Sequence, residues 1–259
     1  MPTTLSLDTA AHVATITLQR PDVRNAFNDT MIAELTACAH QLTDDPTVRI
    51  VILRGAGKVF SAGADIAWMQ RMVDYSEDEN RRDALAMAKM FEALDTLPKP
   101  LVGVVHGAAI GGGTGLAAVC DIVIAADDAL FGFTEAKLGI LPAVISPYCI
   151  AKIGLSHARA LFLTAERFTA QRARDIGLVH HVVPAAVLDQ QLGAIVQELS
   201  SSAPGAMRRI KALVPQVAAM TPAEAMPLTS AAIAAQRVSP EGQDGLKAFL
   251  GKTAPGWTR

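Results

Sequence analysis

The pattern of apolar and polar positions changes character along the chain. In the first half, short apolar runs end at turn-forming residues and predict strands. These strands are expected at residues 13–18, 48–54, 101–105, 122–125 and 130–133. Between them, apolar positions at helical spacing predict one helix capped by Asn28 and carrying Ile32, Leu35, Ala39 and Leu42, and another over residues 77–97 with Ala84, Met87, Phe91 and Leu94 on its buried face. Strands alternating with helices predict an α/β core with parallel strands, and no strand is expected after residue 133.

From Pro184 onward the pattern is wholly helical, and proline or serine opens or bounds each segment. The helices are expected at residues 185–199, 204–219, 222–237 and 240–250. Three consecutive serines at 200–202 mark a boundary between a core of residues 1–199 and a helical region of residues 200–259. This tail has many apolar positions and little to cover them, which indicates packing on another subunit.

Composition narrows the class of protein. The chain has 259 residues, of which 51% are hydrophobic and 19% charged, so it can bury a large core in one domain with an appendage. Its net charge is −2 and no basic stripe is visible, which argues against a nucleic-acid surface. Without a secretory signal or a long uncharged apolar span, the sequence predicts a soluble, cytoplasmic protein that does not enter a membrane.

Cysteine and histidine usage predicts neither disulfides nor a metal. Cys38, Cys120 and Cys149 are odd in number, far apart and set among apolar neighbours, as reduced core cysteines are. The six histidines show no metal-ligand spacing, so no metal is expected.

Two glycine-bearing turns and one carboxylate carry the chemistry. The turns are Ser61-Ala62-Gly63-Ala64-Asp65 and Ile110-Gly111-Gly112-Gly113, and the carboxylate is Glu135. Each turn leads from a strand-like run into a helix-like run, so each can present an unpaired backbone N–H. Two such donors make an oxyanion hole, which binds a carbonyl oxygen as negative charge develops on it. Taken alone, the triple glycine equally suits a tight turn, and Glu135 equally suits a solvated pair with Lys137.

An ordered set of motifs resembles the crotonase, or enoyl-CoA hydratase/isomerase, superfamily over nearly the whole chain. The set is Arg20-Pro21 with Arg24-Asn25-Ala26, Phe60 to Asp65, His106 to Gly113, Cys120-Asp121-Ile122, Glu135 with Leu138-Gly139, Ala173 to Val179, and Glu241-Gly242 with Ala248-Phe249 and Lys252. The order of these motifs is specific where a triple glycine is not. The resemblance implies an α/β, crotonase-type ββα spiral core with a C-terminal helical trimerisation region, assembled as a homotrimer or a dimer of trimers.

The resemblance also implies roles for individual residues. The N–H groups of Ala64 and Gly112 would hold the thioester oxygen of an acyl-CoA, and Glu135 would be the acid/base group, its pKa raised by apolar neighbours. Coenzyme A enters as part of the substrate, with no permanently bound cofactor. Its binding residues by the same resemblance are Arg24 for the phosphates, backbone groups of Ala62, Asp65 and Ile66 for the adenine, and Phe249 and Lys252 from a neighbouring subunit. The Asp65 side chain itself suits a helix N-cap.

Two departures from the superfamily bear on the reaction. Gly115 stands where two-glutamate hydratases carry the second carboxylate, so either Glu135 makes both proton transfers, or Ser146 or Tyr148 helps, or the reaction needs one base only. Ala143 stands where dienoyl isomerases, aryl-CoA dehalogenases and hydroxyacyl-CoA hydrolases have an aspartate, which argues against those reactions. Gly115, Ala67-Trp68-Met69 and the run from Pro142 to Tyr148 resemble bacterial methylglutaconyl-CoA and isohexenylglutaconyl-CoA hydratases, enzymes of leucine and acyclic-terpene breakdown.

These residues together predict hydration of a branched or carboxylated 2-enoyl-CoA, with Gly115 leaving room for the acyl group. One of three arginines, Arg71, Arg81 or Arg82, is a candidate partner for a distal substrate carboxylate, although a solvated helix face explains all three equally well. One alternative is a Δ3,Δ2-enoyl-CoA isomerase in which Glu135 alone moves a proton. Another is a catalytically silent relative that binds CoA or RNA.

Overall fold

The computed structural model describes residues 2–258. A six-stranded sheet forms its centre, in the order β1-β2-β3-β4-β6-β9, and only the β1–β2 pair is antiparallel. Its strands are β1 (Leu5–Ala10), β2 (Val13–Leu18), β3 (Ile50–Gly55), β4 (Leu101–Val105), β6 (Ile122–Ala126) and β9 (His181–Val183). Strand β4 is buried along its whole length, so its continuous apolar sequence reflects helices on both faces.

A small second sheet lies across the end of the first and carries the glycine turns. Its order is β5-β7-β8, with strands β5 (Ala108–Ile110), β7 (Leu130–Gly132) and β8 (Arg167–Thr169). Strand β5 leads directly into helix α4 (Gly112–Val119), and β7 is followed by the short 3-10 helix η2 (Glu135–Leu138). The triple glycine and Glu135 therefore follow two neighbouring parallel strands.

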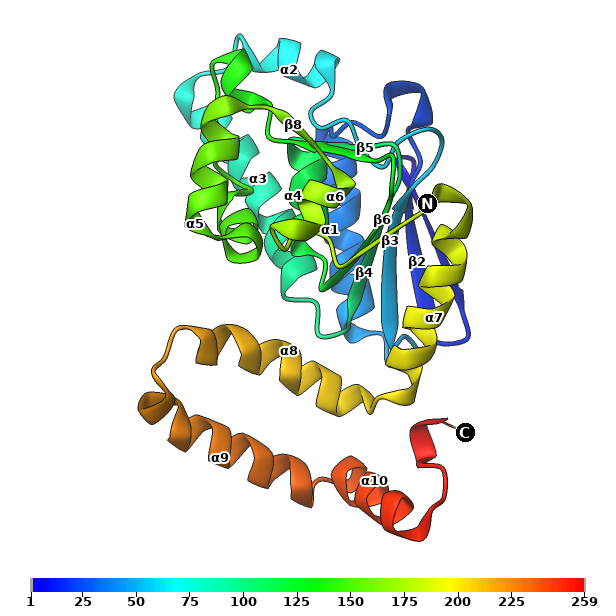
Figure 1. Ribbon diagram of the computed structural model, residues 1–259. Coiled ribbons are helices and arrows are strands. Elements are labelled where there is room, and N and C mark those ends of the chain that lie inside the picture. The colour runs from blue at the N-terminus through cyan, green and yellow to red at the C-terminus, as the bar shows by residue number, and fades with distance from the viewer. Residues whose placement is uncertain (1, 259) are drawn as a thin grey trace.

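Helices cover both faces of the large sheet, and Figure 1 shows α1 and α4 on one side of it and α7 on the other. The helices of the core are α1 (Asp29–Asp44), α2 (Ile66–Met72), α3 (Glu77–Asp95), α4, α5 (Ser146–Thr164), α6 (Ala170–Asp175) and α7 (Leu188–Ser201). Asn28 caps α1 by accepting a hydrogen bond from the N–H of Met31 at 2.9 Å, as predicted. None of the helices among the described residues is both long enough and apolar enough to span a membrane.

The tail consists of α8 (Pro204–Ala218), α9 (Pro222–Val238) and α10 (Pro240–Gly251), which extend away from the core (Figure 1). Glu241 of α10 accepts hydrogen bonds from the first-turn N–H groups of Gly205 and Ala206 in α8, at 2.8 and 2.9 Å. Lys211 of α8 joins this unit to the core through an ion pair with Asp121 at 2.7 Å. Large apolar side chains of the tail are exposed in this chain, namely Ile210, Val214, Met220, Met226, Ile233, Val238, Leu246, Phe249 and Leu250.

Most predicted elements are confirmed, but two expectations are wrong, namely that no strand follows residue 133 and that Ala84 is buried. Strands β8 and β9 follow residue 133, but each has three residues, too few to show an alternating pattern. Helix α5 was not predicted, because Ser146-Pro147 at its start and a kink at Gly154, with φ +72°, break its periodicity. Ala84 of α3 is exposed, and the buried residues of that helix are Met90, Phe91 and Leu94. Helix α7 ends at Ser201, within the three serines at 200–202, and helix α8 begins at Pro204.

Candidate active site

The two glycine turns meet in the structure. Ser61 and Ala109 form a β-bridge, in which Ile110 donates its N–H to the Ser61 carbonyl at 3.0 Å. Gly63 has φ +90°, and a Cβ added there would lie 2.8 Å from the carbonyl oxygen of Ile110. Only glycine permits both the backbone conformation and this close approach. The residue that follows, Ala64, is thereby held beside the start of helix α4.

Glu135 lies against the second turn. Gly111 has φ +53° and ψ −120°, and a Cβ added there would lie 3.0 Å from Glu135 Oε1. The N–H of Gly111 donates to the carbonyl of Gly132 at 2.8 Å, which fixes strand β7 and the residues after it beside the turn. The glycine therefore keeps the carboxylate within a short distance of the first residue of α4.

Two backbone N–H groups at this place are available to a ligand. Across residues 2–258, no acceptor in the chain pairs with the N–H of Ala64 or of Gly112. Gly112 is the first residue of α4, so its N–H belongs to the unpaired first turn and carries the partial positive charge of a helix start. The predicted donors thus lie on the two joined turns, with Glu135 next to one of them.

Glu135 is a half-buried carboxyl group with one oxygen, Oε2, buried and without a hydrogen-bond partner in the chain. Burial raises the pKa of Glu135, as predicted. The neighbours differ from expectation, because Leu138 and Ile140 are exposed while Phe131 and Phe133 are buried. Within the described chain Glu135 makes no ion pair with Lys137, so the solvated-pair interpretation is wrong.

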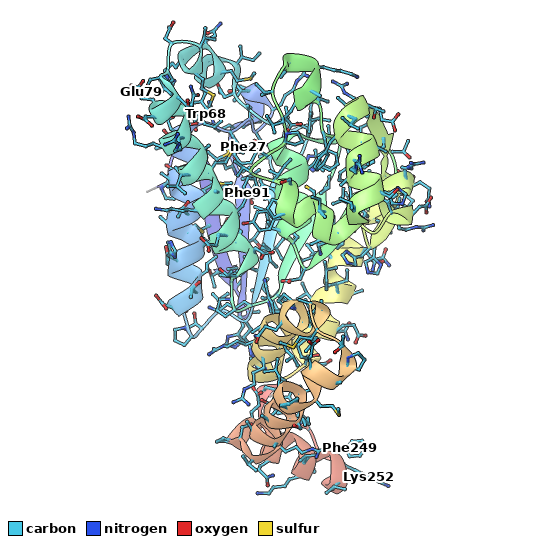
Figure 2. All side chains as sticks on the ribbon, turned by 90° about the vertical axis from the view of Figure 1, so that its left-hand side faces the viewer. Phe27, Trp68, Glu79, Phe91, Phe249 and Lys252 are labelled. Atoms are coloured by element: carbon cyan, nitrogen blue, oxygen red, sulfur yellow. The ribbon has the colours of Figure 1, made fainter. Side chains whose placement is uncertain are left out.

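Apolar side chains form the wall next to Gly112. A Cβ added at Gly112 would lie 3.0 Å from both Met87 Cε and Phe27 Cε2. The rings of Phe27 and Phe91 follow, with centroids 6.4 Å apart. Trp68 of α2 is buried on the same side of the core, where Figure 2 shows it with Phe27 and Phe91. An apolar wall next to a carbonyl-binding position suits the hydrocarbon part of an acyl chain.

The prediction that Gly115 leaves room for a substrate is wrong. A Cβ added at Gly115 would lie 2.3 Å from Ile145 Cγ2 and 3.1 Å from Phe91 Cζ. The space that a larger side chain would need is filled by the buried Ile145. The role of Ile145 could not be predicted from the sequence, because a single isoleucine directly before a helix carries no signal of its position in the fold. Of the two side chains offered as helpers in proton transfer, Ser146 donates its hydroxyl to the Ala143 carbonyl at 2.7 Å, and the Tyr148 ring packs against Phe91 with centroids 5.9 Å apart.

We expect Gly115→Glu to lower the melting temperature markedly and to leave hydration of crotonyl-CoA no faster than in the wild type. The added side chain collides with Ile145 and places a charge in an apolar setting. Gly193→Glu is the matched control, because nothing lies within 4 Å of a Cβ at that exposed helical glycine. Thermal unfolding and steady-state kinetics of both variants test this. Faster hydration by a stable Gly115→Glu protein would contradict the packing described here.

The residues proposed for CoA binding lie in different settings. Arg24 is exposed and adopts a left-handed conformation, with φ +56°. The N–H of Ala62 donates to the Arg24 carbonyl at 2.9 Å, and that of Asp65 donates to the Phe27 carbonyl at 2.8 Å, so neither N–H is available for adenine. The Asp65 side chain caps α2 as predicted, accepting from the N–H groups of Ala67 and Trp68. Ile66 remains 75% exposed.

Phe249 and Lys252 do not join this site within the chain. Figure 2 shows both at the far end of the tail, away from Phe27 and Phe91. Phe249 is 81% exposed. Their assignment to the CoA site of a neighbouring subunit therefore stays a prediction.

Two of the three candidate arginines for a substrate carboxylate already have acidic partners. Arg71 pairs with Asp29 at 3.2 Å, and Arg81 pairs with Glu77 at 2.9 Å. Both pairs are exposed and belong to helix surfaces. The structure thus favours the interpretation of these two arginines as part of a solvated helix face.

Known proteins are similar to this chain over nearly its whole length. The profile of the family described as enoyl-CoA hydratase/isomerase matches residues 8–259. A crystal structure of an enoyl-CoA hydratase from Shewanella pealeana superimposes with a TM-score of 0.96 at 38% identity, covering 99% of this chain and 96% of the other. AtuE of Pseudomonas aeruginosa superimposes with a TM-score of 0.95 at 38% identity, covering 99% of this chain and 100% of the other.

Sequence comparison adds a curated relative, the short-chain-enoyl-CoA hydratase of Clostridium acetobutylicum. It is 36% identical over 207 residues, which are 79% of this chain and 78% of the relative. The family profile covers nearly the whole chain, including both glycine turns and Glu135. The chain therefore belongs to the enoyl-CoA hydratase/isomerase family, the crotonase superfamily.

Proposed function

We propose that this protein catalyses the reversible hydration of a 2-enoyl-CoA thioester with Glu135 as its single acid/base group. One observation carries the proposal: the Glu135 carboxylate lies against Gly111, beside the unpaired N–H of Gly112. A carboxylate and an oxyanion hole at one place suit proton transfer to and from a carbon chain next to a thioester.

The roles follow from the chemistry of conjugate addition. The thioester oxygen accepts hydrogen bonds from the N–H groups of Ala64 and Gly112. The Glu135 carboxylate removes a proton from water as the water oxygen bonds to C3, and negative charge moves to the thioester oxygen. Glu135 then returns that proton to C2 of the enolate, which leaves a 3-hydroxyacyl-CoA and an ionised carboxylate. No other proton donor is required, and no permanently bound cofactor is proposed.

Isomerisation is the alternative that a specific observation favours. Ile145 fills the space beside Gly115, so a second carboxylate has no room at that position. Moving the double bond from C3–C4 to C2–C3 needs only one base, which removes a proton from C2 and returns it to C4. Glu135 can perform that transfer without a positioned water.

The acyl group, the assembly and the location are further proposals. A branched or carboxylated acyl chain rests on the resemblance of Ala67-Trp68-Met69 and of Pro142 to Tyr148. Arg71 and Arg81 are paired and Gly115 provides no space, so Arg82 is the arginine left as a candidate for a substrate carboxylate. A trimer or a dimer of trimers would cover the exposed apolar residues of α8 to α10. In such an assembly Phe249 and Lys252 would reach a neighbour's CoA, while Arg24 and backbone groups of Ala62, Asp65 and Ile66 would serve the same chain's CoA. We place the protein in the cytoplasm.

A panel of substrates decides among these functions. We expect crotonyl-CoA, a longer linear 2-enoyl-CoA or methylglutaconyl-CoA to lose its conjugated absorbance and to gain the mass of one water. A 3-enoyl-CoA that gains conjugation at constant mass identifies an isomerase. Preference for crotonyl-CoA over methylglutaconyl-CoA would reject the carboxylated substrate. No turnover of any member would support the silent relative and contradict the hydratase proposal.

The raised pKa of Glu135 predicts the acidic limb of the pH profile. Hydration requires the ionised carboxylate, so kcat/KM falls as the pH drops through the pKa of Glu135. Because burial raises that pKa, the fall begins at a higher pH than it would for an exposed glutamate. Measuring kcat/KM between pH 4 and 9 with a substrate from the panel tests this. A profile that is flat down to the usual range of glutamate would contradict the described burial.

A further inference from the structure

The oxyanion donor at Ala64 has no side chain to place it, so its position depends on neighbouring groups. The main chain of Phe27 holds it from both sides: the Phe27 N–H donates to the Gly63 carbonyl at 2.7 Å, and the Phe27 carbonyl accepts from the Asp65 N–H at 2.8 Å. The peptide groups on either side of Ala64 are thus fixed to one residue of the loop between β2 and α1. Whatever fixes Phe27 relative to Asp65 sets the direction of the Ala64 N–H.

The side chain of Arg20 connects the loop that carries Phe27 to the loop that carries Asp65. Its Nη1 donates to the carbonyl of Ala26, the residue before Phe27, at 2.5 Å. Its Nη2 donates to Asp65 Oδ2 at 2.8 Å. One rigid guanidinium group therefore joins the Phe27 side to the Asp65 side, and a planar fork is suited to two acceptors in fixed geometry.

The other oxygen of Asp65 completes the connection. Asp65 Oδ1 accepts the N–H groups of Ala67 at 2.8 Å and Trp68 at 3.1 Å, the first turn of α2. Burial alone would raise the pKa of Asp65, but the hydrogen bonds from Trp68 and Arg20 outweigh it and lower that pKa. The side chains of Arg20 and Asp65 are only 19% and 9% exposed, so solvent screens their attraction weakly.

Asn25 fixes the backbone of Arg20 through two hydrogen bonds. The Arg20 N–H donates to Asn25 Oδ1 at 2.9 Å, and the Asn25 N–H donates to the Arg20 carbonyl at 2.8 Å. Asn25 is fully buried and its Nδ2 donates to the carbonyls of Ala56 and Val59. The backbone that carries Arg20 is therefore tied to the core, and its guanidinium extends from a fixed base.

We infer that Arg20 is a positioning residue for catalysis, which acts through Asp65 to aim the N–H of Ala64 at the thioester oxygen. The inference rests on the proposed function, because it assigns Ala64 as an oxyanion donor. Small displacements of such a donor reduce rate more than they reduce binding, since its hydrogen bond is strongest in the transition state.

The test compares Arg20→Met, Arg20→Lys and, as control, Arg54→Met, which removes an exposed ion pair with Asp189. We expect Arg20→Met to lower kcat about 10- to 100-fold with little change in KM, the cost of a misplaced catalytic group. Lysine keeps the charge but cannot reach both acceptors, so Arg20→Lys restores part of kcat. Arg54→Met keeps the wild-type kcat.

A spectroscopic measurement separates positioning from general structural support. Butyryl-CoA labelled with 13C at the carbonyl has no double bond to react, and its carbonyl stretching frequency falls when both donors bind the oxygen. We expect Arg20→Met to reduce this fall while the Kd of butyryl-CoA stays close to that of the wild type. If Arg20→Met does not fold, Asp65→Asn decides, because asparagine still caps α2 but loses the ionic partner of Arg20.

The outcomes of these experiments test the positioning role of Arg20 separately from the proposed function on which it rests. A wild-type protein that neither shifts the carbonyl frequency nor turns over an enoyl-CoA overturns the proposed function. An active wild type beside an Arg20→Met or Asp65→Asn variant with unchanged kcat and unchanged carbonyl shift overturns the positioning role alone. Equal losses in the two single variants and in the double variant would support one shared pathway of action.

Discussion

Replacing Glu135 with glutamine is expected to lower kcat by about a hundredfold or more, within the range for a positioned acid/base group. Glutamine has nearly the same shape, so it fits beside Gly111 and leaves the oxyanion donors in place, but it cannot accept and return a proton. Acyl-CoA binding should persist. Steady-state kinetics with a panel substrate, together with calorimetric binding of butyryl-CoA, measure both quantities.

Glu166→Gln is the matched control for this variant. Glu166 is exposed and lines a surface hollow with Lys137 and with Thr134, the residue that precedes Glu135. We expect it to retain wild-type kinetics. A Glu135→Gln protein with nearly wild-type turnover would remove Glu135 from the mechanism, whatever the behaviour of the control.

Gly112→Pro should cost about 3 kcal/mol or more of transition-state stabilisation, the loss typical for one oxyanion donor. Proline removes the N–H of Gly112, and it is compatible with the first position of a helix, which is where Gly112 lies. The added ring also crowds Met87 and Phe27, so the variant needs a reference with the same crowding.

Gly112→Ala supplies that reference, because it adds the Cβ but keeps the N–H. The difference in kcat/KM between the proline and alanine variants measures the donor itself, and circular dichroism establishes that both are folded. Equal activity of the two variants would show that the N–H of Gly112 does not hold the thioester oxygen.

Local sequence signals predicted the elements that position the site. Strand β4 and the helix caps at Asn28 and Asp65 follow from apolar runs and capping chemistry that act over a few residues. Local signals did not predict that the two glycine turns meet. That prediction required the order of motifs shared with a known superfamily. Its physical basis appears only in three dimensions, where Gly63 lies against Ile110.

Side-chain packing across distant segments could not be predicted in the same way. Gly115 lies in α4, and Ile145 lies thirty positions later, directly before α5. Nothing in either segment of the sequence indicates their contact. The bridge from Arg20 to Asp65 likewise joins two loops that are far apart in sequence and meet only in the folded chain. Such contacts depend on the whole fold, whereas strand and cap signals depend on their neighbours in sequence.

Helices α8, α9 and α10 contribute a single buried residue, Ala248, to this chain, whereas α7 alone buries Leu188, Leu192 and Ile195. A segment with so few buried apolar contacts opens at a lower free energy than the sheet it follows. Amide hydrogens of the tail should therefore exchange with solvent while those of β3 and β4 stay protected. The proposed association through the tail would favour its folded form by mass action, and the cooperativity of unfolding would then depend on protein concentration as well as on sequence.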